Sequence, residues 1–182
     1  PHPTGVNLRG GWIDGALDLQ DCRTELDLSL LHCLFPRRPR FRDADLGALY
    51  LTGSRADDGL DLQRLQTETN VHLTEGFHAT GLVDLAGARI GGQLACVGRF
   101  DGAGGRALNA DAATVASDAH MRDGFHATGE VNLCGARITG QLSCVGGRFD
   151  GAAGRALQPE AAAVGGRVLL RGELPATAGA YT

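Results

Sequence analysis

Acidic side chains recur at one repeating position of the chain, and paired carboxylates are a common means of catalysis. Asp61 and Asp84 hold equivalent positions, and in stacked repeats they would lie about 5 Å apart, the separation that retaining glycosidases use. Such enzymes usually hold sugars in an aromatic-lined cleft, whereas the only Trp and Tyr residues, Trp12, Tyr50 and Tyr181, lie elsewhere in the pattern. We therefore assign no catalytic residue, and an enzyme of unknown reaction is the weakest functional hypothesis.

The full column of equivalent polar residues is a candidate partner-binding face. It comprises Asp18, Arg40, Asp61, Asp84, Asn109, Asn132 and Gln158. Its three carboxylates could present an acidic strip to a basic groove of another protein. The alternative is a solvated face that prevents side-by-side aggregation. A second column of the same kind reads Asn7, Asp27, Tyr50, His72, Ala95, His120 and Ser143.

The histidines suggest a metal site by type but not by spacing. His72 and His120 lie 48 residues apart, which in stacked coils separates them by about 9–10 Å. Zinc requires both ring nitrogens within about 2.1 Å of one ion. His78 and His126 stand in identical GFHATG contexts and repeat for the same geometric reason. We expect structural roles for all four histidines, and we predict no metal site and no cofactor.

The densest run of positive charge is the string PRRPRFR. Its arginines, Arg37, Arg38, Arg40 and Arg42, form a candidate basic loop. Such a loop can bind phosphate or an acidic partner, and the alternative is a solvated excursion from the fold, which we place at residues 34–38. The net charge of −4 argues against a general nucleic-acid-binding surface. The string GAGGR at 102–106 lacks the spacing of a nucleotide-binding loop and is expected to be a turn.

All of these positions belong to an internal repeat. GFHATGLVDLAGARIGGQLACVG at 76–98 returns as GFHATGEVNLCGARITGQLSCVG at 124–146, an offset of 48 residues. Inside it, a unit of about 11 residues places apolar side chains at alternate positions between small or polar corners, which indicates short strands with every second side chain inward. The predicted inward residues are Leu85, Ile90, Leu94, Leu133, Ile138 and Leu142. Phe77 and Phe125 are expected to fill the core.

These tandem apolar and small positions, with the string ADLGALYLTGSRADDGLDL at 44–62, resemble the pentapeptide-repeat family over nearly the whole chain. The resemblance implies an all-β fold, a right-handed parallel β-helix of quadrilateral section. Units here are longer than the family's, so with two units per coil we expect about 22–24 residues per coil and about seven coils, a rod roughly 35 Å long. Some members of the family mimic B-DNA and bind type II topoisomerases such as gyrase.

The predicted organisation is a single β-helix solenoid domain over residues 1–182. The chain opens in mid-pattern at Val6 and Leu8, so we expect a segment of a longer protein. No apolar run reaches the roughly 20 residues of a membrane span. The basic residues are all arginine, which indicates a GC-rich genome, and we expect a bacterial one. We predict five free thiols, because Cys96 and Cys144 are inward and too far apart for a disulfide, and free thiols favour the cytoplasm.

The leading functional hypothesis is a non-catalytic β-helical scaffold that binds a protein partner of unknown identity. The open ends of a β-helix expose strand edges, so we also expect self-association through a coil end. A DNA-mimicking gyrase binder is the alternative, and an enzyme is the third hypothesis. Direct binding to nucleic acid is not expected.

Overall fold

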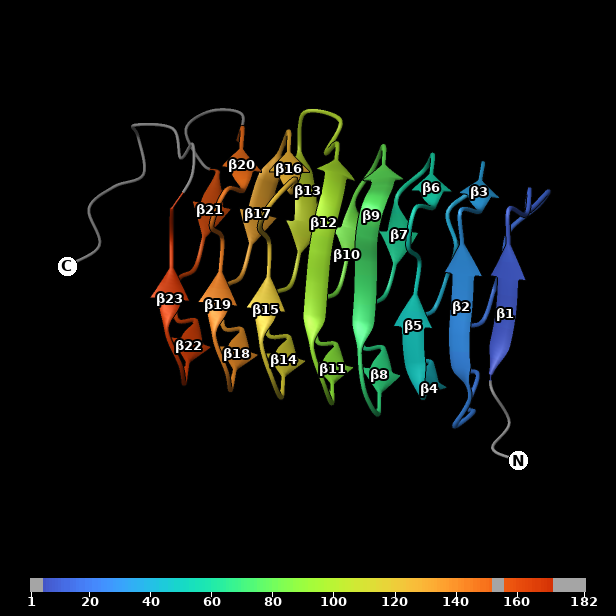
Figure 1. The fold of residues 1–182 in the computed structure, drawn as a ribbon, viewed down its shortest axis with the longest axis horizontal. Helices are drawn as coiled ribbons and strands as arrows, with labels where there is room; N and C mark the ends of the chain where they lie inside the picture. Colours follow the sequence, from blue (N-terminus) through green and yellow to red (C-terminus); the bar gives the residue numbers. More distant parts are fainter. Residues whose placement is uncertain (1–4, 152–155, 172–182) are drawn as a thin grey trace.

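The chain forms a four-sided solenoid of stacked parallel strands (Figure 1). The computed structural model describes residues 5–151 and 156–171, and these residues contain strands and turns but no helix. Strands on the near side rise, strands on the far side descend, and each circuit advances the chain by one coil (Figure 1). The winding is right-handed, as crossovers between parallel strands nearly always are. The predicted all-β, right-handed parallel β-helix of about seven coils is confirmed.

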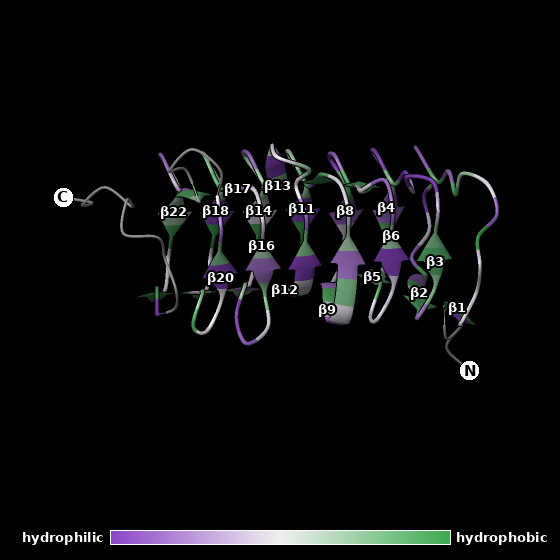
Figure 2. Ribbon diagram, turned by 90° about the horizontal axis from the view of Figure 1, so that it is seen from above, coloured by the Kyte–Doolittle hydropathy of each residue, from purple (hydrophilic) through white to green (hydrophobic). Residues whose placement is uncertain are grey.

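The strands are named here by the face of the rod on which they lie. The front face holds β1 (Val6–Arg9), β2 (Asp27–Leu31), β5 (Ala48–Tyr50), β9 (Val71–Ala79), β12 (Leu94–Phe100), β15 (Ala119–His120), β19 (Leu142–Ser143) and β23 (Val168–Leu169). The upper face holds the second halves of β9 and β12 with β3 (Leu34–Phe35), β6 (Arg55–Ala56), β16 (His126–Ala127) and β20 (Arg148–Phe149). Figure 2 shows the upper-face strands in one row.

The other two faces are separate sheets. The rear face holds β7 (Leu60–Asp61), β10 (Val83–Asp84), β13 (Arg106–Asn109), β17 (Glu130–Asn132) and β21 (Leu157–Gln158). The lower face holds β4 (Asp45–Leu46), β8 (Gln66–Thr67), β11 (Arg89–Ile90), β14 (Thr114–Val115), β18 (Arg137–Ile138) and β22 (Ala163–Val164). Each coil therefore places one short segment on each face.

The strand register gives the length of each coil. Val71 pairs with Leu94, 23 residues later, which agrees with the predicted 22–24. The coil that starts at Leu94 is longer, because Leu94 pairs with Ala119, 25 residues later, and this coil contains the glycine-rich string at 101–105. The equivalent string at 150–154 lies partly outside the described residues, and its coil is longer too.

The core is a set of inward columns, and the predicted members lie inside. Leu85, Ile90, Leu94, Leu133, Ile138 and Leu142 are each at most 4% exposed. Four phenylalanines from successive coils, Phe77, Phe100, Phe125 and Phe149, stack with ring centroids 5.0–5.4 Å apart. Burial of each Phe side chain stabilises the fold by about 2–3 kcal/mol relative to leaving it exposed to water. This stack therefore holds successive coils together at the upper corner.

Two details of register differ from expectation. The excursion predicted at 34–38 begins later, because Leu34 pairs with Arg55 in β3 and the Phe35 side chain enters the core at 1% exposure. In the second polar column Ser29, not Asp27, stacks between Asn7 and Tyr50. The reason is that Leu28 and Leu30 are the buried pair of that coil, which shifts the outward position by two residues.

Large apolar side chains are exposed only on the end coils of the described part of the chain. They are Val6, Leu8 and Trp12 at one end and Val168 and Leu170 at the other. The predicted self-association through a coil end stays a prediction.

Candidate functional site: an arginine row on the lower face

The predicted acidic column lies on the rear face, one residue per coil. Asp18 stacks on Arg40, Arg40 on Asp61, and Asp61 on Asp84. Asn109, Asn132 and Gln158 continue the column in register. The order of the column is therefore as predicted from the sequence.

The middle of this column is buried and bonded to itself, which was not expected of a partner-binding face. Asp61, Asp84, Asn109 and Asn132 are each 6–8% exposed. The Asn132 amide donates to the Asn109 side-chain oxygen and the Asn109 amide donates to Asp84, each at 2.9 Å. Gln63 donates to the second Asp84 oxygen at 2.6 Å. The interpretation as an exposed acidic strip is wrong here, because stacked neighbours cover these side chains and satisfy their hydrogen bonds.

Arginines of the candidate basic loop contact the rear face of the first coils. Arg42 donates to Asp61 at 2.9 Å, Arg40 lies 3.7 Å from Asp18, and Arg38 donates to the Leu60 carbonyl at 3.4 Å. Three of its four arginines thus contact the rear face. Arg37 alone is exposed with no partner among the described residues.

The front-face histidines lie as the repeat predicts, and no metal cluster surrounds them. His72 and His120 flank Ala95, two coils apart. Burial lowers the pKa of each imidazole. His72 Nε2 and His120 Nδ1 are buried without a hydrogen-bond partner. Among residues 5–151 and 156–171, no group of three or more His, Cys, Asp or Glu side chains could hold a metal ion.

The upper-face histidines belong to an ion-pair ladder that the sequence reasoning missed. His78 Nε2 lies 2.9 Å from Asp101, and His126 Nε2 lies 2.9 Å from Asp150. Burial alone would raise the pKa of Asp101, but bonds from Arg99, His78 and Thr128 outweigh it and hold that pKa at about 2.

This ladder accounts for a repeat that spans two coils. Coils carrying Arg-x-Asp alternate with coils carrying His-x-Thr on one column: Arg55, His78, Arg99, His126 and Arg148. Asp101 is placed between His78 of the preceding coil and Thr128 of the following one, and Asp150 pairs in the same way with His126 of the preceding coil. The signal was present in the sequence as this alternation of tripeptides.

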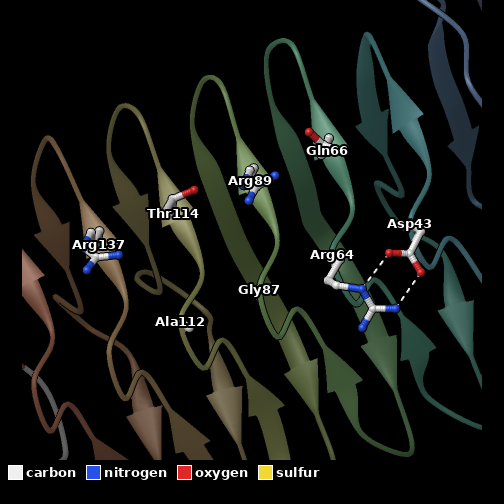
Figure 3. Close-up of a pocket in the computed structure, with 8 residues that line it drawn as sticks. All are labelled: Asp43, Arg64, Gln66, Gly87, Arg89, Ala112, Thr114 and Arg137. Carbon is white, nitrogen blue, oxygen red and sulfur yellow. Dashed lines mark hydrogen bonds and ion pairs between the residues drawn. The ribbon is translucent and has the colours of Figure 1, made fainter.

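The lower face carries a groove lined by cationic and neutral hydrogen-bonding side chains (Figure 3). Gln66, Arg89, Thr114 and Arg137 hold its outward row, one per coil in direct register. We call these four residues the arginine row. The groove has a volume of about 450 Å³, and its remaining lining residues are Asp43, Arg64, Gly87 and Ala112.

The groove exists because no long side chain fills the space at the corner beside the arginine row. Arg64, Gly87 and Ala112 hold the same left-handed corner position on successive coils, with φ of 53°, 66° and 51°. The Arg64 side chain folds back onto Asp43 through two hydrogen bonds of 2.6 Å, and this pairing lowers the pKa of Asp43. On the next two coils the corner offers only Gly87 and Ala112, so Arg89 and Arg137 stand beside open space (Figure 3).

Arg89 and Arg137 are the unpaired arginines in the middle of the rod. Eight arginines lie between positions 55 and 148. Six of them form ion pairs with Asp or Glu: Arg55, Arg64, Arg99, Arg106, Arg122 and Arg148. The guanidinium groups of Arg89 and Arg137 have neither an ion pair nor a hydrogen bond to any described residue, and both residues are exposed. Neither arginine was expected to form a site, although both occur in the repeated string GARI at 87–90 and 135–138.

Comparisons with known proteins give no relative. No protein-family model matches the chain, and neither does any curated protein or solved structure. The resemblance to the pentapeptide-repeat family therefore stays a prediction, while the solenoid itself is shown. None of the described segments forms a helix of the length and apolar character needed to cross a lipid bilayer.

Proposed function

We propose that the protein is a non-catalytic β-helical scaffold module that docks an acidic segment of a partner protein on the arginine row. The observation that carries the proposal is the pair of exposed, unpaired guanidinium groups of Arg89 and Arg137, facing one groove. A guanidinium presents a planar fork of donors that matches a carboxylate. Thr114 between them and Gln66 beside them add neutral hydrogen-bonding groups.

The expected affinity follows from the exposure of the row. An exposed ion pair contributes up to about 1 kcal/mol, so two such pairs change a dissociation constant by up to about 30-fold. The rest of the affinity must come from the partner's contacts along the face. This magnitude suits a reversible scaffold contact.

The competing hypotheses have less support. A DNA mimic needs exposed carboxylates, and Asp61 and Asp84 are each only 6% exposed. A carboxylate enzyme needs a free acid or nucleophile, whereas the oxygens of these two side chains accept bonds from Arg42, Gln63 and Asn109. Both carboxylates are thus committed to holding the coils together.

The proposal is tested by binding of a fluorescein-labelled peptide of ten glutamates to the purified chain. We expect saturable binding that weakens with added salt, and a loss of up to about 30-fold in the Arg89→Gln/Arg137→Gln variant. The matched control is Arg99→Gln/Arg148→Gln, which removes the same charge from two residues two coils apart on the upper face. Equal binding by the two variants, or no binding by the wild type, would overturn the proposal.

The DNA-mimic alternative has its own assay. Purified wild-type protein is added to a gyrase supercoiling reaction at micromolar concentration. We expect no inhibition. Dose-dependent inhibition by the wild type, retained in the Arg89→Gln/Arg137→Gln variant, would favour the DNA mimic over the scaffold.

A further inference from the structure

We infer that the acidic segment binds in an extended polyproline II conformation along the rod axis, with two carboxylates three residues apart on Arg89 and Arg137. This inference rests on the proposed function and adds the conformation and spacing of the ligand. It starts from the register of the lower face, where Arg89 pairs with Thr114 and Thr114 with Arg137.

The spacing of the row selects among peptide conformations. Adjacent strands lie about 4.8 Å apart, so the two arginines are separated by about 9.6 Å along the axis. Residues three apart in a polyproline II helix are separated by about 9.3 Å. Residues two apart in a β-strand span only about 6.8 Å, and four apart about 13.6 Å. A β-strand therefore cannot place carboxylates on both arginines without a mismatch of about 3 Å or more.

The neutral residues of the arginine row favour a ligand in the polyproline II conformation over an α-helical ligand. Glutamates seven apart on a helix lie about 10.5 Å apart and also approach the spacing of the row. A helix, however, uses its own carbonyl oxygens internally, whereas a polyproline II segment has no internal hydrogen bonds. Gln66 and Thr114 alternate with the arginines, and their donors can reach backbone carbonyls of an extended segment.

The lining of the groove disfavours other anionic polymers. Its eight lining residues, shown in Figure 3, include no aromatic side chain, whereas proteins that bind single-stranded nucleic acids stack bases on aromatic rings. An acidic stretch of a protein needs no such stacking, because its carboxylates pair with the guanidinium groups alone.

One end of the groove restricts the placement further. Asp43, held by Arg64, lies on the side of the groove toward Gln66 (Figure 3). Asp43 and Arg64 neutralise each other there, so the two carboxylates of the ligand settle over the unpaired guanidinium groups of Arg89 and Arg137.

The test compares eight-residue proline-rich peptides that contain two glutamates at different spacing, each competing with the labelled ten-glutamate peptide. The glutamates stand two, three or four residues apart with the composition unchanged, and an alanine-based helical peptide carries them seven apart. We expect the three-apart peptide to compete about fivefold better than the two-apart peptide, the value of one ion pair. Arg89→Gln or Arg137→Gln should each remove that preference, whereas Arg99→Gln should keep it.

The outcomes separate the inference from the proposed function. Equal competition by all spacings would overturn the inference while the proposed function stands. A stronger helical peptide would overturn the polyproline II conformation. A ten-nucleotide oligothymidylate that competes better than every peptide would overturn the choice of a protein ligand. If the ten-glutamate peptide itself fails to bind, both the inference and the proposed function fail.

Discussion

Replacing Asn109 by Asp is a sharp test of the buried ladder on the rear face. The Asn109 amide donates to Asp84 at 2.9 Å, and the residue is 8% exposed. An aspartate at this position removes the donor and places a carboxylate one strand spacing from Asp84, on the side opposite Asp61.

The cost follows from two effects. A lost hydrogen bond to a charged group costs about 1.5–3 kcal/mol. Two carboxylates about 4.8 Å apart repel by about 3 kcal/mol at an effective dielectric constant near 20, an effect that rotation toward solvent relieves in part. Together they predict a loss of about 4 kcal/mol in the free energy of unfolding at pH 7.

Urea denaturation followed by circular dichroism measures this loss, with Asn132→Asp as the matched control. Asn132 stacks between Asn109 and Gln158, so its replacement meets no neighbouring carboxylate in the column, and we expect a cost of about 1 kcal/mol. The deficit of Asn109→Asp should shrink below about pH 4, where the two carboxyl groups can share a proton. Equal urea midpoints for the two variants at pH 7 would refute the ladder.

Three further predictions concern the core, the front-face histidines and the thiols. Leu133→Asp buries an unpaired charge at a site 3% exposed, so we expect a loss of about 3–5 kcal/mol in thermal unfolding, and an unchanged melting temperature would mean that Leu133 does not point inward. Because burial lowers the pKa values of His72 and His120 below the ordinary value of about 6.5 for a histidine, the unfolded chain binds more protons below that pH and stability falls on acidification. The His72→Gln/His120→Gln variant should lose less stability than the wild type between pH 7 and 5, and parallel pH profiles would contradict this. All five thiols should alkylate in the denatured chain without reductant, while in the native protein Cys96 and Cys144, whose pKa burial raises to about 12, should resist; fewer than five adducts on mass measurement would reveal a disulfide.

Alternation of apolar residues was sufficient to predict the coil but not its exact register. In a strand every second side chain points to the same face, so the alternation of apolar residues places Leu85 and Leu133 inside. The string LDLSLL at 26–31 offers three alternating leucines, of which only two can occupy the inward pair of that coil. The buried pair is Leu28 and Leu30, a choice made by packing against neighbouring coils that no local pattern encodes.

Burial of outward residues could not be predicted for a related reason, whereas the pairing of some of them has a signal in the sequence. The pattern assigns Asp84 and Asn109 to one outward column, but their exposure depends on Gln63 and the neighbouring coils that cover them. Arg89 and Arg99 are both outward arginines, yet one is unpaired and the other bonds Asp101. The difference arises because a carboxylate stands two residues after Arg99, whereas the position two residues after Arg89 is Gly91.

The central claim, that an acidic partner docks on the arginine row, is tested most directly by nuclear magnetic resonance of the arginine Nε–Hε groups. The ¹⁵N-labelled protein is titrated with the peptide that carries glutamates three residues apart. We expect the Nε–Hε resonances of Arg89 and Arg137 to shift together and saturate at one peptide concentration, while those of Arg99 and Arg148 stay in place. Shifts at Arg99 and Arg148, or at Arg40 and Arg42, with none at Arg89 and Arg137 would contradict the claim.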